Sequence, residues 1–545
     1  MRAFGGAMLV AAFLAAIWLP LADALLGIAP VIPLVEKRLP APRPAFPADR
    51  ASLAALPAAL EAYHDDRFGF RAALIRLHHL LLVRGLRMAP SEDVVLGKDG
   101  WLFLGLQGAI DQHRAVDPLP AEVLAAWQRR LEECHEYCED RGALFLFVIA
   151  PNKLSIYPEH LPDSVRRVGK ETRLDQFLRH MGERSRVPIL DLRPALLEAK
   201  RRELVYRKYD AHWNEVGAFA AYRGIVQELR RTFPAIPLYG EADFRRRVVT
   251  AAGGDLADIV GLPDLYAEDI VVLDLASPPP MRPVVEGMIR ASIPWKEGNI
   301  DRLMAGERTA PFGSEIDDPA LPRLVMIRDS FATNVLGYLS TGFCRAVYYW
   351  QYFVDPEILL HERPDIVVQQ VIERVLLQSH LPPNPPKLVI DFERRRRFRA
   401  SSDVRFVLPA PGARSIAAAP PASFDPAAGA VVVAAPGGER LAVHVPAPTG
   451  ARADAGAILR LAVDADGPLE CGLAFVSDAA PAEDGLPLAT RTLSAGREIV
   501  YFAVGAGDPA GGDPLAPGRH LRIELSGAAA IASLDLEIRG AGPAR

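Results

Sequence analysis

The chain has 545 residues, of which 50% are hydrophobic and 24% are charged, so it is long enough for roughly two or three folded units with buried cores. Its net charge of -5 gives no long-range attraction for nucleic acid, and we find no glycine-rich phosphate loop and no zinc-ligand spacing in the sequence. Four cysteines are too few for a disulfide scaffold. We therefore expect a small-molecule or carbohydrate substrate, and neither a metal nor an organic cofactor.

Residues 1–28 are predicted to be a transmembrane anchor or a signal segment. The run from Ala3 to Ala22 contains no charged residue, and about twenty apolar residues match a hydrocarbon core of roughly 30 Å. Arg2 on the short side predicts that the rest of the chain lies in the periplasm, attached to the inner membrane. The alternative is cleavage near Ala24, which would leave a soluble periplasmic protein.

Residues 29–85 are expected to form a proline-rich spacer followed by an amphipathic helix. Over residues 86–385, strand-like and helix-like runs alternate, which predicts a three-layer α/β/α domain with a mainly parallel sheet. Functional side chains of such sheets gather at the carboxyl ends of the strands. Strands are expected at Phe145–Ala150, Pro188–Leu192, Arg323–Ile327, Cys344–Trp350 and Asp365–Val371, and helices at Glu215–Arg231 and from Ser330 to Leu339.

The composition changes near residue 380. Residues 386–402 are predicted to be a linker, and the basic run Arg394–Arg397 within it is expected to be a solvated hinge. The alternative is a patch that contacts anionic polymer or lipid headgroups. From residue 403 to residue 545, short β-rich runs are separated by glycine, proline and aspartate, which predicts a β-sandwich. The residues alone leave open whether this part binds sugar.

Two short segments carry side chains suited to nucleophilic catalysis. Asp210 and His212 lie two residues apart before a predicted helix, so the carboxylate can hold one imidazole nitrogen while the other acts as a base. Ser330 lies at a strand-to-helix turn, where backbone N–H groups can stabilise an oxyanion. Because serine needs a base to become a nucleophile, the two segments together predict a Ser330–His212–Asp210 triad, although each alone is also a common structural motif.

Several stretches match one family in the same order along residues 30 to 380. They are DDRFGFR, VVLGKDGWLFL, APNKLSIYPEHLP, DAHWNEVGAFAAY, GGDLA at Gly253–Ala257, IRDSFA and PDIVVQQVIERVL. Together they resemble the SGNH hydrolase-like alginate O-acetyltransferase family (AlgJ/AlgX-like). The resemblance implies that Ser330 is the nucleophile, His212 the base and Asp210 the acid that orients it.

The same resemblance implies a wider set of contacts and partners. Asn152 and Lys153 would lie at the rim of the substrate pocket, and Arg374 would contact the sugar or support the site. A membrane-bound O-acyltransferase would supply the acetyl group, a polysaccharide would accept it, and the C-terminal β-sandwich would bind carbohydrate. Arg328 departs from the family, which usually has glycine there, and its side chain is expected to crowd the turn or alter the pocket.

The sequence therefore predicts a periplasmic O-acetyltransferase that acts on an exopolysaccharide through an acyl-serine. Two alternatives remain open. One is a polysaccharide acetyl esterase with the same triad. The other is a catalytically inactive polysaccharide-binding scaffold of an export or acetylation complex, which Arg328 would favour.

Overall fold

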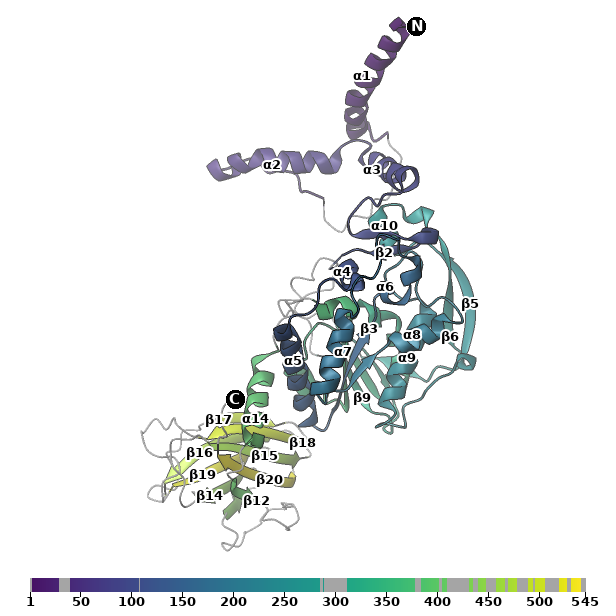
Figure 1. Ribbon diagram of the computed structural model, residues 1–545. Helices are drawn as coiled ribbons and strands as arrows, with labels where there is room; N and C mark the ends of the chain where they lie inside the picture. Colours follow the sequence, from purple (N-terminus) through teal and green to yellow (C-terminus); the bar gives the residue numbers. More distant parts are fainter. Residues whose placement is uncertain are drawn as a thin grey trace.

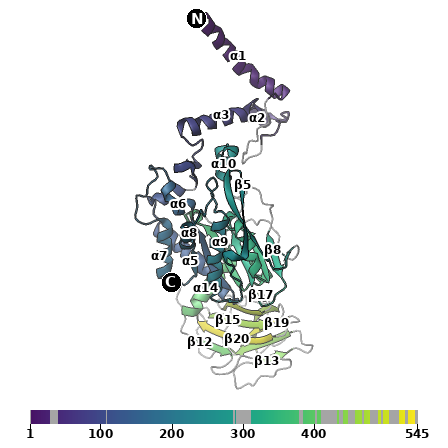
Figure 2. The ribbon, with the colours of Figure 1, turned by 90° about the vertical axis from the view of Figure 1, so that its right-hand side faces the viewer.

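The computed structural model describes residues 2–28, 40–106, 108–284, 288, 311–377 and 384–400, together with the C-terminal strands between residues 404 and 540. Helices come first along the chain, an α/β region follows, and antiparallel sheets occupy the C-terminal part (Figure 1). The N-terminal helices extend away from the α/β region on the side opposite the C-terminal sheets (Figure 2).

The N-terminal part is more helical than its proline content predicts. Helix α2 begins inside the stretch expected to be a spacer. The Asp49 carboxylate accepts a hydrogen bond from the Ser52 amide, and the Ser52 hydroxyl accepts one from the Asp49 amide; such a capping box satisfies amides that a helix start leaves unpaired. Within the described residues, no helix is long and apolar enough to cross a membrane, so the transmembrane helix predicted at residues 1–28 is not found. The helices are α1 (Arg2–Leu26), α2 (Arg50–Arg67) and α3 (Arg71–Leu80), with a π-helical turn, η1, at Leu81–Leu86.

A seven-stranded mixed sheet forms the centre of the α/β region. Its order is β4-β3-β11-β9-β10-β8-β7, in which the first five strands run parallel, β8 pairs antiparallel with β10, and β7 pairs antiparallel with β8. All five predicted strands form, and β3 and β11 are buried along almost their whole length, as expected for apolar runs covered on both faces. The antiparallel edge was not predicted. The strands are β4 (Ile189–Asp191), β3 (Leu144–Ala150), β11 (Ile366–Ile372), β9 (Arg323–Arg328), β10 (Arg345–Trp350), β8 (Phe312–Ile316) and β7 (Met281–Pro283).

Helices flank this sheet (Figure 1). The rings of Trp127, Phe147 and Phe177 lie about 6 Å apart and join α5 and α7 to β3. Helix α9 begins at Asn214, as predicted, because the side chain of Asn214 accepts a hydrogen bond from the Gly217 amide. The helices are α4 (Ala109–Arg114), α5 (Ala121–Glu139), α6 (Lys153–Ile156), α7 (Arg173–Arg184), α8 (Arg193–Lys200), α9 (Glu215–Leu229), α12 (Leu336–Leu339) and α13 (Pro356–Glu362).

An antiparallel ribbon of two long strands lies beside the main sheet. Strands β5 (Phe244–Ala251) and β6 (Glu268–Leu275) pair along their full length, and the chain between them forms α10 (Asp255–Val260). This connection packs against the short strands β1 (Val94–Leu96) and β2 (Leu102–Leu104) through a small apolar cluster that includes Ala211. The ribbon connection is thereby brought against the loop that precedes α9.

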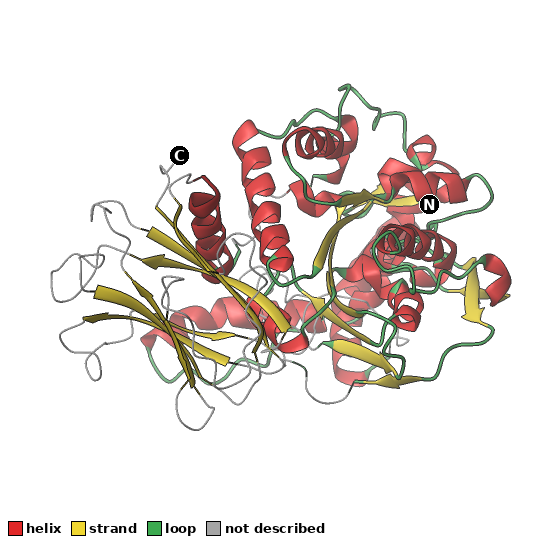
Figure 3. Cartoon of the chain, turned by 90° about the horizontal axis from the view of Figure 1, so that it is seen from below, coloured by secondary structure: helices red, strands yellow, loops and turns green. Residues whose placement is uncertain are grey.

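The C-terminal strands form two antiparallel sheets (Figure 3). One has the order β12-β20-β15-β18 and the other β13-β14-β19-β16-β17. The β-rich character expected from residue 403 onward is thus present, whereas the sandwich and its binding of sugar stay predictions. The strands are β12 (Val404–Leu408), β13 (Val431–Ala434), β14 (Arg440–Pro446), β15 (Ala457–Ala465), β16 (Leu469–Ser477), β17 (Ala489–Leu493), β18 (Gly496–Val504), β19 (Arg519–Ser526) and β20 (Ile531–Gly540).

The segment predicted to be a linker, residues 386–402, is instead mostly a helix, α14 (Pro386–Ala400), that packs on α5 and contacts the C-terminal strands. The solvated hinge expected at its arginines is wrong for Arg395, whose side chain is 5% exposed and pairs with Glu136, Glu139 and Asp140 at 3.4, 2.7 and 3.0 Å. The sequence alone does not reveal these acidic partners, because they lie in and directly after α5, 256 and 259 residues away for two of the contacts.

We expect Arg395→Met to lower the free energy of unfolding by about 3–5 kcal/mol, because Asp140, which is 7% exposed, loses its ion-pair partner, while Glu136 and Glu139 keep only the pairs with Arg399 at 3.5 and 3.8 Å. Urea unfolding of the purified chain measures the change. Arg396→Met, at an exposed position of the same helix, is the control and should stay within about 0.5 kcal/mol of the wild type. Equal stability of the two variants would show that the buried ion pairs do not hold α14 in place.

Candidate active site

A chain of hydrogen bonds joins the three residues that the sequence singled out. His212 Nε2 lies 3.0 Å from Ser330 Oγ, and His212 Nδ1 lies 2.8 Å from Asp210 Oδ1. The backbone N–H of His212 also donates to Asp210 Oδ1 at 2.9 Å, so the aspartate holds both the main chain and the ring of the histidine. With Nδ1–H donating to the carboxylate, Nε2 is left as the acceptor that faces the serine hydroxyl.

Burial and neighbouring charges shift the pKa values of His212 and Asp210 in opposite directions. Burial disfavours the imidazolium, but the hydrogen bond to Asp210 and its charge outweigh burial, and the net effect raises the pKa of His212 above its usual value. Burial likewise works to raise the pKa of Asp210, yet the hydrogen bonds and charge of His212 hold it well below its usual range. Asp210 is therefore ionised and can stabilise a positive charge on the ring.

Ser330 is presented by a tight turn at the carboxyl end of β9. The preceding residue, Asp329, is 2% exposed, and its carboxylate accepts hydrogen bonds from the amides of Phe331 and Ile372, at 2.9 and 2.6 Å, and from the Gln370 side chain at 3.0 Å. These bonds tie the turn to the neighbouring strand β11. The single helix predicted from Ser330 to Leu339 is instead a 3-10 helix, η6 (Ser330–Asn334), followed by the short α12. Asp329 caps the first turn of η6.

Arg328 does not prevent the serine from meeting the histidine. Its guanidinium lies 4.7 Å from the ring centroid of Trp350, its register partner on β10, and donates to Thr333 Oγ1 at 3.1 Å. Burial lowers the pKa of Arg328 to about 10, so the group is still charged at neutral pH. The Ser330–His212 hydrogen bond thus forms with arginine in place of the family's glycine.

Lys153 was expected at the rim of a substrate pocket, and this is wrong. Its side chain is 3% exposed, and Nζ donates to the carbonyl oxygens of Leu102, Lys208 and Asp210 at 2.7, 2.9 and 3.0 Å. All three donors of an ammonium group are thereby used. Lys153 thus holds the loop that carries Asp210 through its backbone carbonyls. This role depends on contacts that are distant in the sequence.

The neighbouring Asn152 is not at a rim either. It is 5% exposed, and its backbone N–H donates to the Glu373 carboxylate at 2.7 Å. Arg374, by contrast, lies beside the site: its guanidinium is 5.6 Å from the ring centroid of Phe331, and its charge opposes protonation of His212.

We expect Lys153→Met to lower the free energy of unfolding by about 2 kcal/mol or more, since the Leu102 and Asp210 carbonyls lose the Nζ donor at about 1–3 kcal/mol each, while the Lys208 carbonyl keeps the Leu102 amide at 3.2 Å. Urea unfolding of the purified chain measures the change. Lys170→Met, at an exposed position, is the matched control. A Lys153→Met chain as stable as this control would contradict the structural role.

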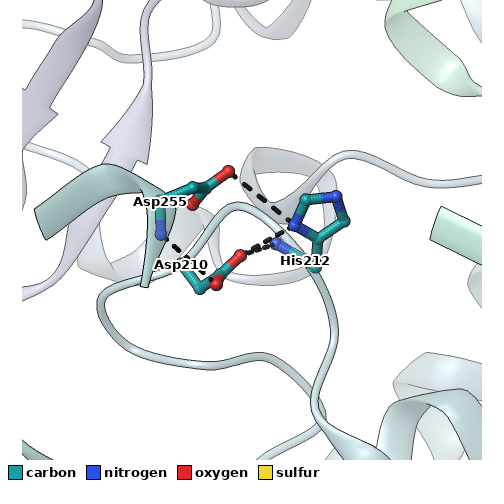
Figure 4. A group of neighbouring side chains, drawn as sticks. All are labelled: Asp210, His212 and Asp255. Atoms are coloured by element: carbon teal, nitrogen blue, oxygen red, sulfur yellow. Dashed lines mark hydrogen bonds and ion pairs between the residues drawn. The ribbon is translucent and has the colours of Figure 1, made fainter. Parts of the chain in front are cut away.

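Asp255 is the residue at the site that sequence reasoning missed. It begins α10, in the stretch GGDLA, and its Oδ2 lies 3.7 Å from His212 Nδ1 (Figure 4). Burial and the charge of Asp210 raise the pKa of Asp255 to about 6. The sequence signal that could have identified Asp255 is the GGDLA stretch, in which no role was given to the aspartate.

Asp210, His212 and Asp255 also have potential metal-ligating atoms within 4.8 Å of one another, which makes them the one such group among the described residues. However, His212 Nδ1 and Asp210 Oδ1 are already bonded to each other, and Asp255 Oδ1 accepts the Ala211 amide at 2.7 Å. A metal would have to break these bonds and take Nδ1 from the carboxylate. The donor set fits a hydrogen-bonded histidine better than a cation site.

A mainly parallel sheet with a serine at the carboxyl end of a central strand and a histidine on a neighbouring loop fits an SGNH-like α/β domain. Residues 94–270 match the family model of the SGNH hydrolase-like domain of the acetyltransferase AlgX. The resemblance to the AlgJ/AlgX-like family is thereby confirmed. The matched range includes Asp210, His212 and Asp255, and ends before Ser330.

Two curated relatives, both described as probable alginate O-acetylases, match part of the chain. The chain is 26% identical over 212 residues to a probable alginate O-acetylase AlgJ of Pseudomonas syringae, which covers 38% of this chain and 51% of the relative. It is 27% identical over 180 residues to its Pseudomonas aeruginosa counterpart, which covers 32% and 42%. The chain thus spans about half the length of the curated relatives it matches. Among solved structures, the O-acetyltransferase domain of Pseudomonas putida AlgJ has a TM-score of 0.37 at 16% identity, covering 55% of this chain and 97% of that one.

Proposed function

We propose that this chain is an O-acetyltransferase that moves acetyl groups onto a polysaccharide through an acyl-serine. The observation that carries the proposal is the hydrogen-bonded chain from Ser330 Oγ through the His212 ring to Asp210. The match of residues 94–270 to an acetyltransferase domain, together with relatives named as alginate O-acetylases, supports acetyl as the group transferred and a polysaccharide as the acceptor.

In the first half of the reaction, Ser330 Oγ attacks the carbonyl carbon of an acetyl donor while His212 Nε2 takes the hydroxyl proton. The negative charge moves to the carbonyl oxygen, where the positive charge of Arg374, whose guanidinium lies beside Phe331, stabilises it. When the tetrahedral intermediate collapses, the bond to the donor breaks and the imidazolium returns the proton to the leaving group. The product is acetyl-Ser330.

In the second half, a hydroxyl of the polysaccharide enters where the donor left. His212 Nε2 takes its proton as the sugar oxygen attacks the acetyl carbon, and the proton then passes back to Ser330 Oγ as the acyl bond breaks. Asp210 keeps the ring in the required tautomer and stabilises the imidazolium in both halves. Acetyl transfer prevails over hydrolysis when the acceptor binds well enough to exclude water.

The proposal includes a location and a donor. The uncharged run near the N-terminus motivates export of the catalytic domain to the periplasm, and a membrane-bound O-acyltransferase would then deliver the acetyl group. Fractionation of cells that express the full chain tests the location; recovery of the protein in the cytoplasmic fraction alone would contradict it.

The same three side chains would also serve an acetyl esterase, so the test must separate the two reactions. Purified chain is given a small chromogenic acetyl ester, with and without an oligosaccharide acceptor, and acetylated sugar and free acetate are both measured. We expect acetylated sugar to form at the expense of acetate. Acetate release equal to ester consumption, whatever the acceptor, would identify an esterase. No ester turnover at all would favour the inactive scaffold, an alternative that has lost the support expected from Arg328 because the Ser330–His212 bond forms beside it.

A further inference from the structure

The loop that carries Asp210 and His212 is held against the connection of the β5–β6 ribbon by contacts on both sides. Glu268, the first residue of β6, accepts hydrogen bonds from the Arg207 side chain at 3.0 Å and from the Lys208 amide at 2.7 Å. The Tyr209 carbonyl accepts the Ala257 amide at 3.3 Å, and the rings of Tyr209 and Tyr266 lie 4.9 Å apart. The ribbon connection therefore fixes where the histidine loop sits.

Within this interface, Asp255 makes the contacts that lie nearest to the imidazole. Its Oδ1 accepts the Ala211 amide at 2.7 Å, and its Oδ2 lies 3.7 Å from His212 Nδ1. Its own backbone N–H points to Asp210 Oδ2 at 3.4 Å. Asp255 thus touches the main chain between the two triad residues, the ring of one and the carboxylate of the other (Figure 4).

The fit depends on a residue without a side chain at position 254. A Cβ added to Gly254 would lie 2.0 Å from Asp210 Oδ2, a distance that real contacts do not permit. The Asp210 carboxylate therefore lies directly against the backbone of the ribbon connection. Glycine at position 254 thus allows the next residue, Asp255, to lie beside the loop that carries Asp210 and His212.

We propose that Asp255 is a second positioning residue for His212: it fixes the Asp210–His212 loop, places a second carboxylate beside Nδ1, and takes over part of the Asp210 function when Asp210 is lost. This inference deepens the proposed acyl transfer and rests on it for the catalytic readout. Like-charged carboxylates this close are costly, so the arrangement is explained by the cationic ring that they share during the reaction.

Other charged groups around the imidazole must be counted before pH behaviour is assigned to Asp255. Arg374, in η8 (Glu373–Leu377), opposes protonation of His212. Asp210, in the same loop as His212, favours it. The remaining charged groups around the two carboxylates are Lys153, Arg207 and Glu268. Only Asp210 and Asp255 bring a carboxylate oxygen within 4 Å of His212 Nδ1 among the described residues.

The test compares Asp255→Asn with Asp269→Asn, which makes the same chemical change at an exposed position of the same ribbon. Asparagine keeps an acceptor for the Ala211 amide and removes the charge. We expect ester turnover to fall by about 10–100-fold, by analogy with the loss of outer hydrogen-bond partners of metal-binding histidines, and the acidic limb of the pH profile to move to lower pH. The limb moves in that direction because one of the two charges that raise the His212 pKa is gone. Asp269→Asn should change neither.

A double variant separates sharing from a merely structural effect. In an Asp210→Asn background, Asp255→Asn should cost more than it costs in the wild type, because Asp255 is then the remaining carboxylate near Nδ1. Equal costs in both backgrounds, together with an unmoved pH limb, would overturn the inference. If Asp255→Asn fails to fold, Asp255→Ser keeps a hydroxyl acceptor near the Ala211 amide and is measured in its place.

An NMR titration of the His212 ring keeps the inference testable even without turnover. The signal is assigned as the one lost in His212→Gln, and its pKa is measured in the wild type and in Asp255→Asn. A fall in that pKa supports the inference whether or not the chain turns over ester, while an unchanged value overturns it. Absence of ester turnover in the wild type would count against the proposed function alone.

Discussion

Replacing Ser330 by alanine is expected to reduce ester turnover and acetyl transfer by about 10⁴- to 10⁶-fold, the range that follows removal of the nucleophile from a serine triad. The loss arises because no other hydroxyl is hydrogen-bonded to His212 among the described residues. Steady-state kinetics with a chromogenic acetyl ester measure it. Stability should stay within about 0.5 kcal/mol of the wild type, since the turn is held by Asp329 and not by the serine side chain.

Ser185→Ala is the matched control for this variant. Ser185 ends α7, and its hydroxyl accepts only a long 3.4 Å hydrogen bond from Val187. If Ser330→Ala is as active as this control, Ser330 is not the nucleophile, and the polysaccharide-binding scaffold becomes the favoured function.

The Asp210→Asn variant is expected to lose about 10⁴-fold in turnover with little change in fold. Asparagine fills the same space and still accepts the His212 amide, but it cannot stabilise the imidazolium or enforce the tautomer that leaves Nε2 free. Because the Asp210 charge raises the pKa of His212, the ring should also titrate at lower pH in the variant. Steady-state kinetics across pH measure both effects.

Asp269→Asn again serves as the control, at an exposed position of the β5–β6 ribbon. A loss in Asp210→Asn no larger than in this control would mean that the 2.8 Å contact between the carboxylate and the ring does not contribute to the chemistry.

Much of the α/β region could be predicted from local pattern. The apolar runs that form β3 and β11 are buried along almost their whole length. Their continuous apolar composition predicts this burial. The cap at Asn214 is likewise a short-range signal. The pairing of Ser330 with His212, 118 residues apart, could be proposed only because both residue types fall at strand ends of one domain.

What the sequence could not supply depends on partners distant along the chain. Lys153 reads as a surface group until the three carbonyl oxygens around its Nζ are known. Arg395 reads as solvated until α14 packs against the acidic residues of α5. Asp255 gains its meaning only when the β5–β6 connection folds back onto the histidine loop. In each case the deciding contact is tertiary, and no local periodicity encodes it.

The most direct test of the central claim is to look for the covalent intermediate. The chain is mixed briefly with a chromogenic acetyl ester without acceptor, quenched in acid, digested and examined by mass spectrometry. The peptide containing Ser330 is expected to gain the mass of one acetyl group and to lose it when a sugar acceptor is added before the quench. Colour release at full rate in Ser330→Ala, or an acetyl group found only on other peptides, would contradict it.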